Sequence, residues 1–148
     1  NVGGGRLSGD PYGESNKDIL DVMCTATQLP GRQILTNERV IGFKKEQMAY
    51  GYETPDVNLS LYDNNHYSIR RYFESWQNRI ISPYSKEVRF KNEYSADVYI
   101  SQLDHNENFV YGVTLLEAYP STLNVVELNN DPNGIVQINV QLTYTNWR

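Results

Sequence analysis

Residues 135–145 read IVQINVQLTYT, and this stretch decides the fold class. From Val136 onwards, apolar side chains alternate with polar Gln, Asn and Thr; the apolar ones are Val136, Ile138, Val140, Leu142 and Tyr144. A period of two residues is typical of a β-strand with one face in the core and the other in contact with solvent. The stretch therefore predicts an antiparallel strand and a mainly β protein.

The same alternation, less regular, recurs along most of the chain. It predicts strands over residues 18–27, 33–43, 57–61, 96–101 and 109–119. Pro30-Gly31 ends the first of these, and residues 129–134 (NNDPNG) form a strong turn signal. The polar residues 44–46 follow the strand over 33–43, and the chain then returns through Met48, Tyr50 and Tyr52, which indicates a long hairpin-like arm.

A single amphipathic helix is expected over residues 65–81. Its apolar side chains recur at the i, i+4, i+7 spacing of a buried stripe and form the predicted core face, Ile69, Phe73, Trp76 and Ile80. Asp63 and the asparagines after it are candidate N-caps, and Ser82-Pro83 marks the end. About six strands and one helix predict a mainly β (α+β) fold: a small antiparallel β-barrel or sandwich with one flanking α-helix.

The domain organisation follows from length and glycine content. Residues 1–17 are rich in glycine and are interpreted as a loop or as the remnant of a first strand. A chain of 148 residues can bury one sizeable core, so residues 18–148 are expected to form a single β-barrel domain.

Composition excludes several classes of function. The net charge is −5, with 13 scattered basic residues against 18 acidic ones, which is unfavourable for binding nucleic acid through its phosphates. The single cysteine, Cys24, excludes an internal disulfide, and the sequence shows no metal-ligand spacing, so no cofactor is expected. Without a long apolar run or a signal peptide, we expect a chain that folds in the cytoplasm and does not insert into a membrane.

No catalytic constellation emerges, so an enzyme is not expected. The glycine-rich residues 3–9 lack the Gly-Lys-Ser/Thr ending of a phosphate-binding loop. His66 and His105 have no ligand-type neighbours and are interpreted as surface residues, while Cys24 falls on the apolar face of its predicted strand. The chain has 12 tyrosines, more than a barrel of this size can bury, and tyrosine is favoured at protein interfaces.

Four stretches in a shared order resemble the tail tube family of contractile-tailed, T-even-type bacteriophages, including its baseplate tube-initiator relatives. They are residues 24–31 (CTATQLPG), 57–61 (VNLSL), 72–77 (YFESWQ) and 142–147 (LTYTNW), and the resemblance covers residues 22–148. It implies a structural virion protein that forms hexameric rings, which stack into the inner tail tube. It also implies tail sheath and baseplate proteins as partners, assembly in the bacterial cytoplasm, and a lumen through which DNA passes without specific binding.

Two alternatives stay open. The family's first strand is missing or reduced in this sequence, and a glycine-rich insertion follows it. Such an insertion resembles the tube-initiator proteins as much as the repeating tube subunit, so either role is possible. A β-barrel carbohydrate-binding module of a tail appendage, using Tyr and Trp as stacking surfaces, is the alternative from another class.

The resemblance and the residue pattern together give candidate assembly residues. The arm over residues 40–52 is expected to contact the next ring through Val40, Phe43, Met48, Tyr50 and Tyr52. The alternative is that this arm folds back as barrel strands. The polar side chains of the last strand are expected to face the lumen; they are Gln137, Asn139, Gln141 and Thr143. Because residues 135–145 carry no proline or charge, this strand is also expected to be a sheet edge that pairs with a neighbouring subunit.

Overall fold

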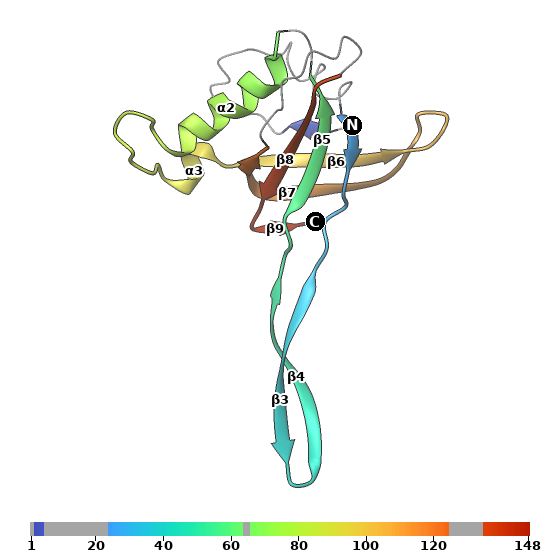
Figure 1. Ribbon diagram of the computed structural model, residues 1–148. Helices are drawn as coiled ribbons and strands as arrows, with labels where there is room; N and C mark the ends of the chain where they lie inside the picture. Colours follow the sequence, from blue (N-terminus) through green and yellow to red (C-terminus); the bar gives the residue numbers. More distant parts are fainter. Residues whose placement is uncertain (1, 5–23, 64–65, 125–134) are drawn as a thin grey trace.

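The computed structural model describes residues 2–4, 24–63, 66–124 and 135–148 (Figure 1). The described strands are β1 (Val2–Gly4), β2 (Cys24–Thr27), β3 (Gln33–Ile41), β4 (Lys44–Glu53), β5 (Val57–Tyr62), β6 (Ala96–Leu103), β7 (Phe109–Leu123), β8 (Gln137–Thr143) and β9 (Asn146–Trp147). Two helices, α2 (Ser68–Ile80) and α3 (Lys91–Tyr94), lie between β5 and β6. The predicted mainly β, antiparallel fold with a flanking helix is confirmed, with more strands than the six expected.

The strands form two sheets. The larger has the order β1-β6-β7-β8-β5-β2, with β9 paired to β7, and the smaller consists of β3 and β4 alone. Every strand pair described is antiparallel. The larger sheet curls because β6 and β7 run across the direction of β5 and β8 (Figure 1). The body is therefore an open half-barrel, from which the smaller sheet projects as an arm.

The curl depends on β7, which belongs to both parts of the larger sheet. Its first part pairs with β6 and its last residues pair with β8. Just before the change of partner, at the register shift between the Val98–Leu115 and Ala96–Ala118 pairs, Glu117 adopts a positive φ of 52°, which is uncommon for a residue with a side chain. The Asp97 carboxylate accepts a hydrogen bond from the Glu117 backbone N at 3.1 Å, which stabilises this corner.

One hydrophobic core fills the inside of the curl. It is formed by inward-facing residues of β5, β6, β7 and β8, by α2 and by Tyr144 just after β8. It comprises Val57, Leu59, Leu61, Ile69, Phe73, Trp76, Val98, Ile100, Val113, Leu115, Ala118, Ile138, Val140, Leu142 and Tyr144. Of the four predicted helix residues, Ile69, Phe73 and Trp76 are buried and Ile80 is half-buried. The Trp76 indole N donates to the Tyr94 carbonyl at 2.7 Å, so its polar atom is paired.

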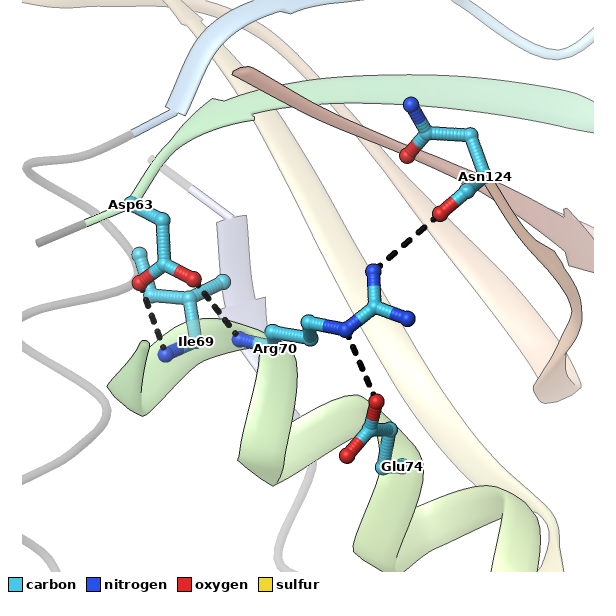
Figure 2. Close-up of polar contacts among 5 residues, drawn as sticks. All are labelled: Asp63, Ile69, Arg70, Glu74 and Asn124. Carbon is cyan, nitrogen blue, oxygen red and sulfur yellow. Dashed lines mark hydrogen bonds and ion pairs between the residues drawn. The ribbon is translucent and has the colours of Figure 1, made fainter. Parts of the chain in front are cut away.

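Asp63 holds the start of α2 from outside the helix (Figure 2). Tyr67, the residue at the N-cap, is left-handed with φ 54° and has no capping side chain. The Asp63 carboxylate instead accepts hydrogen bonds from the backbone N of Ile69 at 3.2 Å and of Arg70 at 3.3 Å. This carboxylate thereby pairs two of the amides that every helix start leaves unpaired.

Some expected elements lie partly or wholly outside the described residues. The strand over 18–27 is described from Cys24 onwards, as β2, while its residues 18–23 and the turn over 129–134 lie outside. The helix begins at Ser68, later than expected. In the segment interpreted as a glycine-rich loop or strand remnant, Val2–Gly4 form β1 and pair with β6, and its other residues are outside the description.

Candidate functional site

The arm of β3 and β4 stands away from the body. Its strands pair only with each other, and a turn at Gly42 and Phe43 joins them, with Gly42 at φ 63°. Glycine in the first turn position is the arrangement of a type II′ hairpin. Figure 1 shows the arm extending far below the half-barrel, and none of its residues belongs to the core. The alternative prediction, that this segment folds back as barrel strands, is wrong.

The five residues predicted to contact another ring all lie exposed on this arm. Their exposed fractions are 64% for Val40, 111% for Phe43, 47% for Met48, 62% for Tyr50 and 54% for Tyr52. Val40 pairs with Lys45, and Met48 pairs with Asn37. Because paired residues share a face and successive residues alternate, Val40 and Met48 lie on opposite faces. The arm thus offers apolar surface on both sides and at its tip.

The root of β3 is clamped to the last described strand. The Arg32 guanidinium carbon lies 5.1 Å from the ring centre of Tyr52 and 5.1 Å from that of Trp147. Its Nη2 donates to the Asn146 side chain at 3.3 Å, and the Trp147 indole N donates to the Gly31 carbonyl at 3.2 Å. A cation between two aromatic faces is favourable on both sides, so this cluster ties both arm strands to β9.

The root of β4 is tied to β8 and the residue after it. The Tyr144 hydroxyl donates to the Pro55 carbonyl at 2.7 Å, and the Gln141 amide donates to the Asp56 carboxylate at 2.8 Å. Burial, and then the nearby Asp56 charge, raise the pKa of Tyr144 above its ordinary value. The hydroxyl therefore keeps its proton and remains a donor. With both roots held, the direction of the arm is set by residues near the end of the described chain.

The predicted lumen residues share the polar face of β8. Gln137 and Asn139 are exposed, Gln141 and Thr143 are half-buried, and the intervening Ile138, Val140 and Leu142 point to the core. The face continues onto β5, where Ser60 donates to the Asn139 side chain at 2.8 Å. Neither β5 nor β8 contains Lys or Arg. These side chains therefore form a neutral, hydrogen-bonding surface.

The prediction that residues 135–145 form a sheet edge is wrong. β8 lies between β5 and β7, and both neighbours pair with it. A strand paired on both sides needs no proline or charge to prevent association, which explains its composition. At the ends of the described sheet order stand β1 and β2.

The tyrosines divide into exposed and packed groups. Tyr62, Tyr99 and Tyr111 are exposed on the body, as Tyr50 and Tyr52 are on the arm. Tyr94 and Tyr119 instead pack edge to face, with ring centres 5.3 Å apart, where α3 meets β7. They belong to the structure of the corner and not to an open surface.

The described residues contain no group of three His, Cys, Asp or Glu side chains placed to hold a metal ion. His66 and His105 are exposed and far apart in the chain, and Cys24 is half-buried beside the core. No helix among the described residues has the length and apolarity to cross a membrane.

Sequence reasoning missed the Arg32 clamp. Arg32 and Trp147 come from distant parts of the chain, and no periodic pattern relates residues that pair only in the tertiary structure. The sequence offers only one indication of such a contact: an arginine directly after Pro30-Gly31 and a tryptophan at 147, two side chains that can form a cation–π pair.

Among the described residues, an exposed apolar arm and a neutral polar sheet face are the features of a structural component that assembles with other chains. The family comparison agrees, because the phage tail tube protein family matches residues 6–148. The chain belongs to the phage tail tube protein family. The comparison with curated proteins gave no match.

Solved structures of contractile injection systems share the fold. A chain of the anti-feeding prophage tube-terminating cap matches with a TM-score of 0.66 and 16% identity, over 84% of this chain and 78% of that one. A chain of the anti-feeding prophage baseplate matches with a TM-score of 0.63 and 17% identity, over 82% of this chain and 76% of that one. A chain of the sheath-tube complex of the extracellular contractile injection system PVC matches with a TM-score of 0.61 and 15% identity, over 80% of this chain and 74% of that one.

Proposed function

We propose that this protein forms hexameric rings that stack into the inner tube of a contractile phage tail, and that DNA passes through this tube. The observation that carries the proposal is the arm: a hairpin with exposed apolar side chains on both faces, rooted firmly in the body of a chain from the tail tube family. Isolated two-stranded hairpins are marginally stable in water, so an arm of this length needs a partner surface. The next ring supplies it.

Stacking through the arm gives the tube its stability. Burying Phe43, Met48 and Tyr50 against the adjacent ring contributes about 1.5–3 kcal/mol for each side chain that becomes fully buried. The symmetry of the ring multiplies this contribution. Contacts on both faces of the arm imply that it inserts between surfaces of the next ring and does not merely lie on one of them.

The neutral face of β5 and β8 suits a DNA channel. Phosphate affinity depends on the number of Lys and Arg side chains that displace counterions, and this face has none. Gln137, Asn139, Gln141 and Thr143 line the lumen in this proposal. Tail sheath and baseplate proteins are the further partners, and the assembled protein resides in the virion tail.

The double substitution Phe43→Ser, Tyr50→Ser tests the stacking. Both side chains are exposed, so the protomer folds as before, and electron microscopy is expected to show single rings or protomers where the unaltered protein forms tubes. Met48→Leu, which keeps an apolar side chain on the arm, is the matched control and retains tubes. Full-length tubes from the double variant contradict stacking through the arm.

A second substitution tests the lumen. Replacing Asn139 and Gln141 by Arg is expected to make assembled tubes bind duplex DNA, with affinity falling as salt rises. Tubes that form but gain no such binding show that this face of β8 is not luminal.

A tube-end component is the second candidate function, because the fold is shared with a baseplate chain and with a tube-terminating cap. A tube initiator would form rings that carry tubes of another subunit and not long tubes of its own. Electron microscopy of the purified protein alone separates the two: long homopolymeric tubes indicate the repeating subunit, and isolated rings indicate an end component. A monomer that binds a glycan and never assembles contradicts both.

A further inference from the structure

Two exposed segments project from opposite sides of the body (Figure 1). One is the loop between α2 and α3, residues 81–90, here called the basic end. The other is the turn between β6 and β7 with its flanking residues, 103–111, here called the acidic end. Neither segment belongs to the arm, the polar face or the core.

The basic end is an ordered loop with its apolar side chains turned outward. Ile81 and Val88 form an isolated antiparallel bridge, and the backbone N of Lys86 donates to the Ser82 carbonyl at 2.9 Å. The exposed fractions are 96% for Tyr84, 66% for Val88 and 78% for Phe90. Lys86 and Arg89 are exposed beside them, with the exposed Glu87 between the two. An open hollow of about 480 Å³ adjoins the loop, with Ile80, Ile81, Pro83 and Pro120 in its wall.

The acidic end has the same build with the opposite charge. Its turn is closed by hydrogen bonds from Asp104 N to the Asn108 carbonyl at 2.8 Å and from Glu107 N to the Asp104 carbonyl at 2.9 Å. Phe109 is 61% exposed and Val110 is 59% exposed. Asp104 and Glu107 are exposed, and neither forms an ion pair with another described residue.

The charges divide along the chain in the same way. Six of the 13 basic residues fall between positions 70 and 91, namely Arg70, Arg71, Arg79, Lys86, Arg89 and Lys91. Residues 92–147 contain no Lys or Arg at all. Of these six, Arg70 and Lys91 are paired with Glu74 and Glu117 and lie outside the basic end. Within the ends themselves, Lys86, Arg89 and Glu87 give the basic end a net charge of +1, whereas Asp104 and Glu107 give the acidic end −2 with His105 neutral, so the two ends differ in sign.

We propose that the basic end of one copy docks onto the acidic end of the next copy within a ring. The proposal rests on the ring of the proposed function and names its lateral contact. Different patches on opposite sides of one molecule give a head-to-tail contact, which closes into a ring when the rotation between copies permits. Lys86 and Arg89 face Asp104 and Glu107, and the hollow beside the loop receives the apolar side chains Phe109 and Val110.

Charge reversal tests this pairing. Lys86→Glu with Arg89→Glu places like charges across the contact, as does Asp104→Lys with Glu107→Lys, and each pair is expected to lower the fraction of chains in rings by about tenfold or more. All four substitutions in one chain restore opposite charges and are expected to restore rings. Arg71→Glu with Arg148→Glu, two exposed positions outside the arm and outside both ends, is the charge-matched control and leaves ring closure unchanged. Light scattering and electron microscopy give the ring fraction, and circular dichroism checks folding.

The outcomes separate this contact from the proposed function. Suppose that the unaltered chain forms rings. If both reversal variants also form rings, or if the fourfold variant does not regain them, this contact is wrong, although the ring itself remains supported. A wild-type chain that never forms rings overturns both. If a reversal variant misfolds, Lys86→Cys with Glu107→Cys in a Cys24→Ser background decides instead: oxidation is expected to link copies covalently into ladders, and monomers alone overturn the contact.

Discussion

Single side chains far apart in the sequence decide where the arm points. Arg32 lies between the rings of Tyr52 and Trp147, and its guanidinium also donates to Asn146. Each contact is modest, but together they join β3, β4 and β9 at one point. The planar guanidinium can stack on both rings at once, which an ammonium group does less well.

Removing this guanidinium loosens the arm. Arg32→Ala is expected to lower the free energy of unfolding by about 1–2 kcal/mol, from two cation–π contacts, and to speed amide hydrogen exchange near Tyr52. Arg32→Lys retains part of the effect. Arg39→Ala, on the arm and outside the clamp, is the control and stays within about 0.5 kcal/mol. Equal exchange at the root in both alanine variants contradicts the clamp.

Glu117, at the corner of β7, gives a pH-dependent contribution. Hydrogen bonds from Thr145 and from Lys91, and then the Lys91 charge, lower the pKa of this carboxyl. A group with a lowered folded-state pKa stabilises the fold above its unfolded pKa of about 4.3, and that contribution is lost as pH falls through the folded pKa. Glu117→Gln is expected to reduce the loss of stability on acidification, measured as the fall in the thermal unfolding midpoint between neutral pH and about pH 3. Glu53→Gln, on the arm, is the control. If Glu117→Gln loses as much stability on acidification as the unaltered protein, Glu117 does not make this pH-dependent contribution.

At the scale of elements, α2 depends on a cap that lies outside the helix. Asp63→Ala removes the acceptor for the amides of Ile69 and Arg70 and is expected to cost about 0.5–2 kcal/mol in urea unfolding. Asp63→Asn keeps an oxygen acceptor and costs less. Identical losses in the two variants show that the carboxylate acts through something other than capping.

β8 is expected to behave as a central strand. Gln141→Pro removes a backbone N–H between two paired neighbours and is expected to destabilise the protomer by more than about 2 kcal/mol, with unfolding and not merely loss of rings. Gln141→Ala, which keeps the backbone donor, separates the backbone effect from that of the side-chain contact to Asp56. A folded proline variant that only fails to assemble would restore the edge-strand interpretation.

The sequence predicted these elements where the pattern is local. The alternation in β8 and the helical stripe of Ile69, Phe73 and Trp76 report burial directly, because each repeats the period of its own element. Strand order is not local, so the composition of β8 wrongly predicts an edge strand. The extension of β7 to Leu123, past the expected end at 119, follows from the corner at Glu117, which period-two patterning does not reveal.

At the scale of the whole molecule, the arm beyond its roots is energetically separate from the half-barrel. The arm strands pair only with each other and supply nothing to the core. Replacing residues 35–51 by an Asn-Gly turn is therefore expected to leave a folded body, with an unfolding free energy within about 1 kcal/mol of the full chain. Near-ultraviolet circular dichroism and thermal unfolding check the fold, and electron microscopy is expected to show no tubes. An unfolded product contradicts the separation.

The order of synthesis gives the arm root a further consequence. Arm residues leave the ribosome early, whereas Tyr144, Asn146 and Trp147, which hold both roots, emerge after the whole of β5 to β8. A nascent chain forms the hairpin only marginally, because two strands alone are barely stable in water, and it cannot fix the hairpin's direction. In the proposed tube, a chain would become competent for stacking only once β8 and β9 have folded, which disfavours premature polymerisation on polysomes.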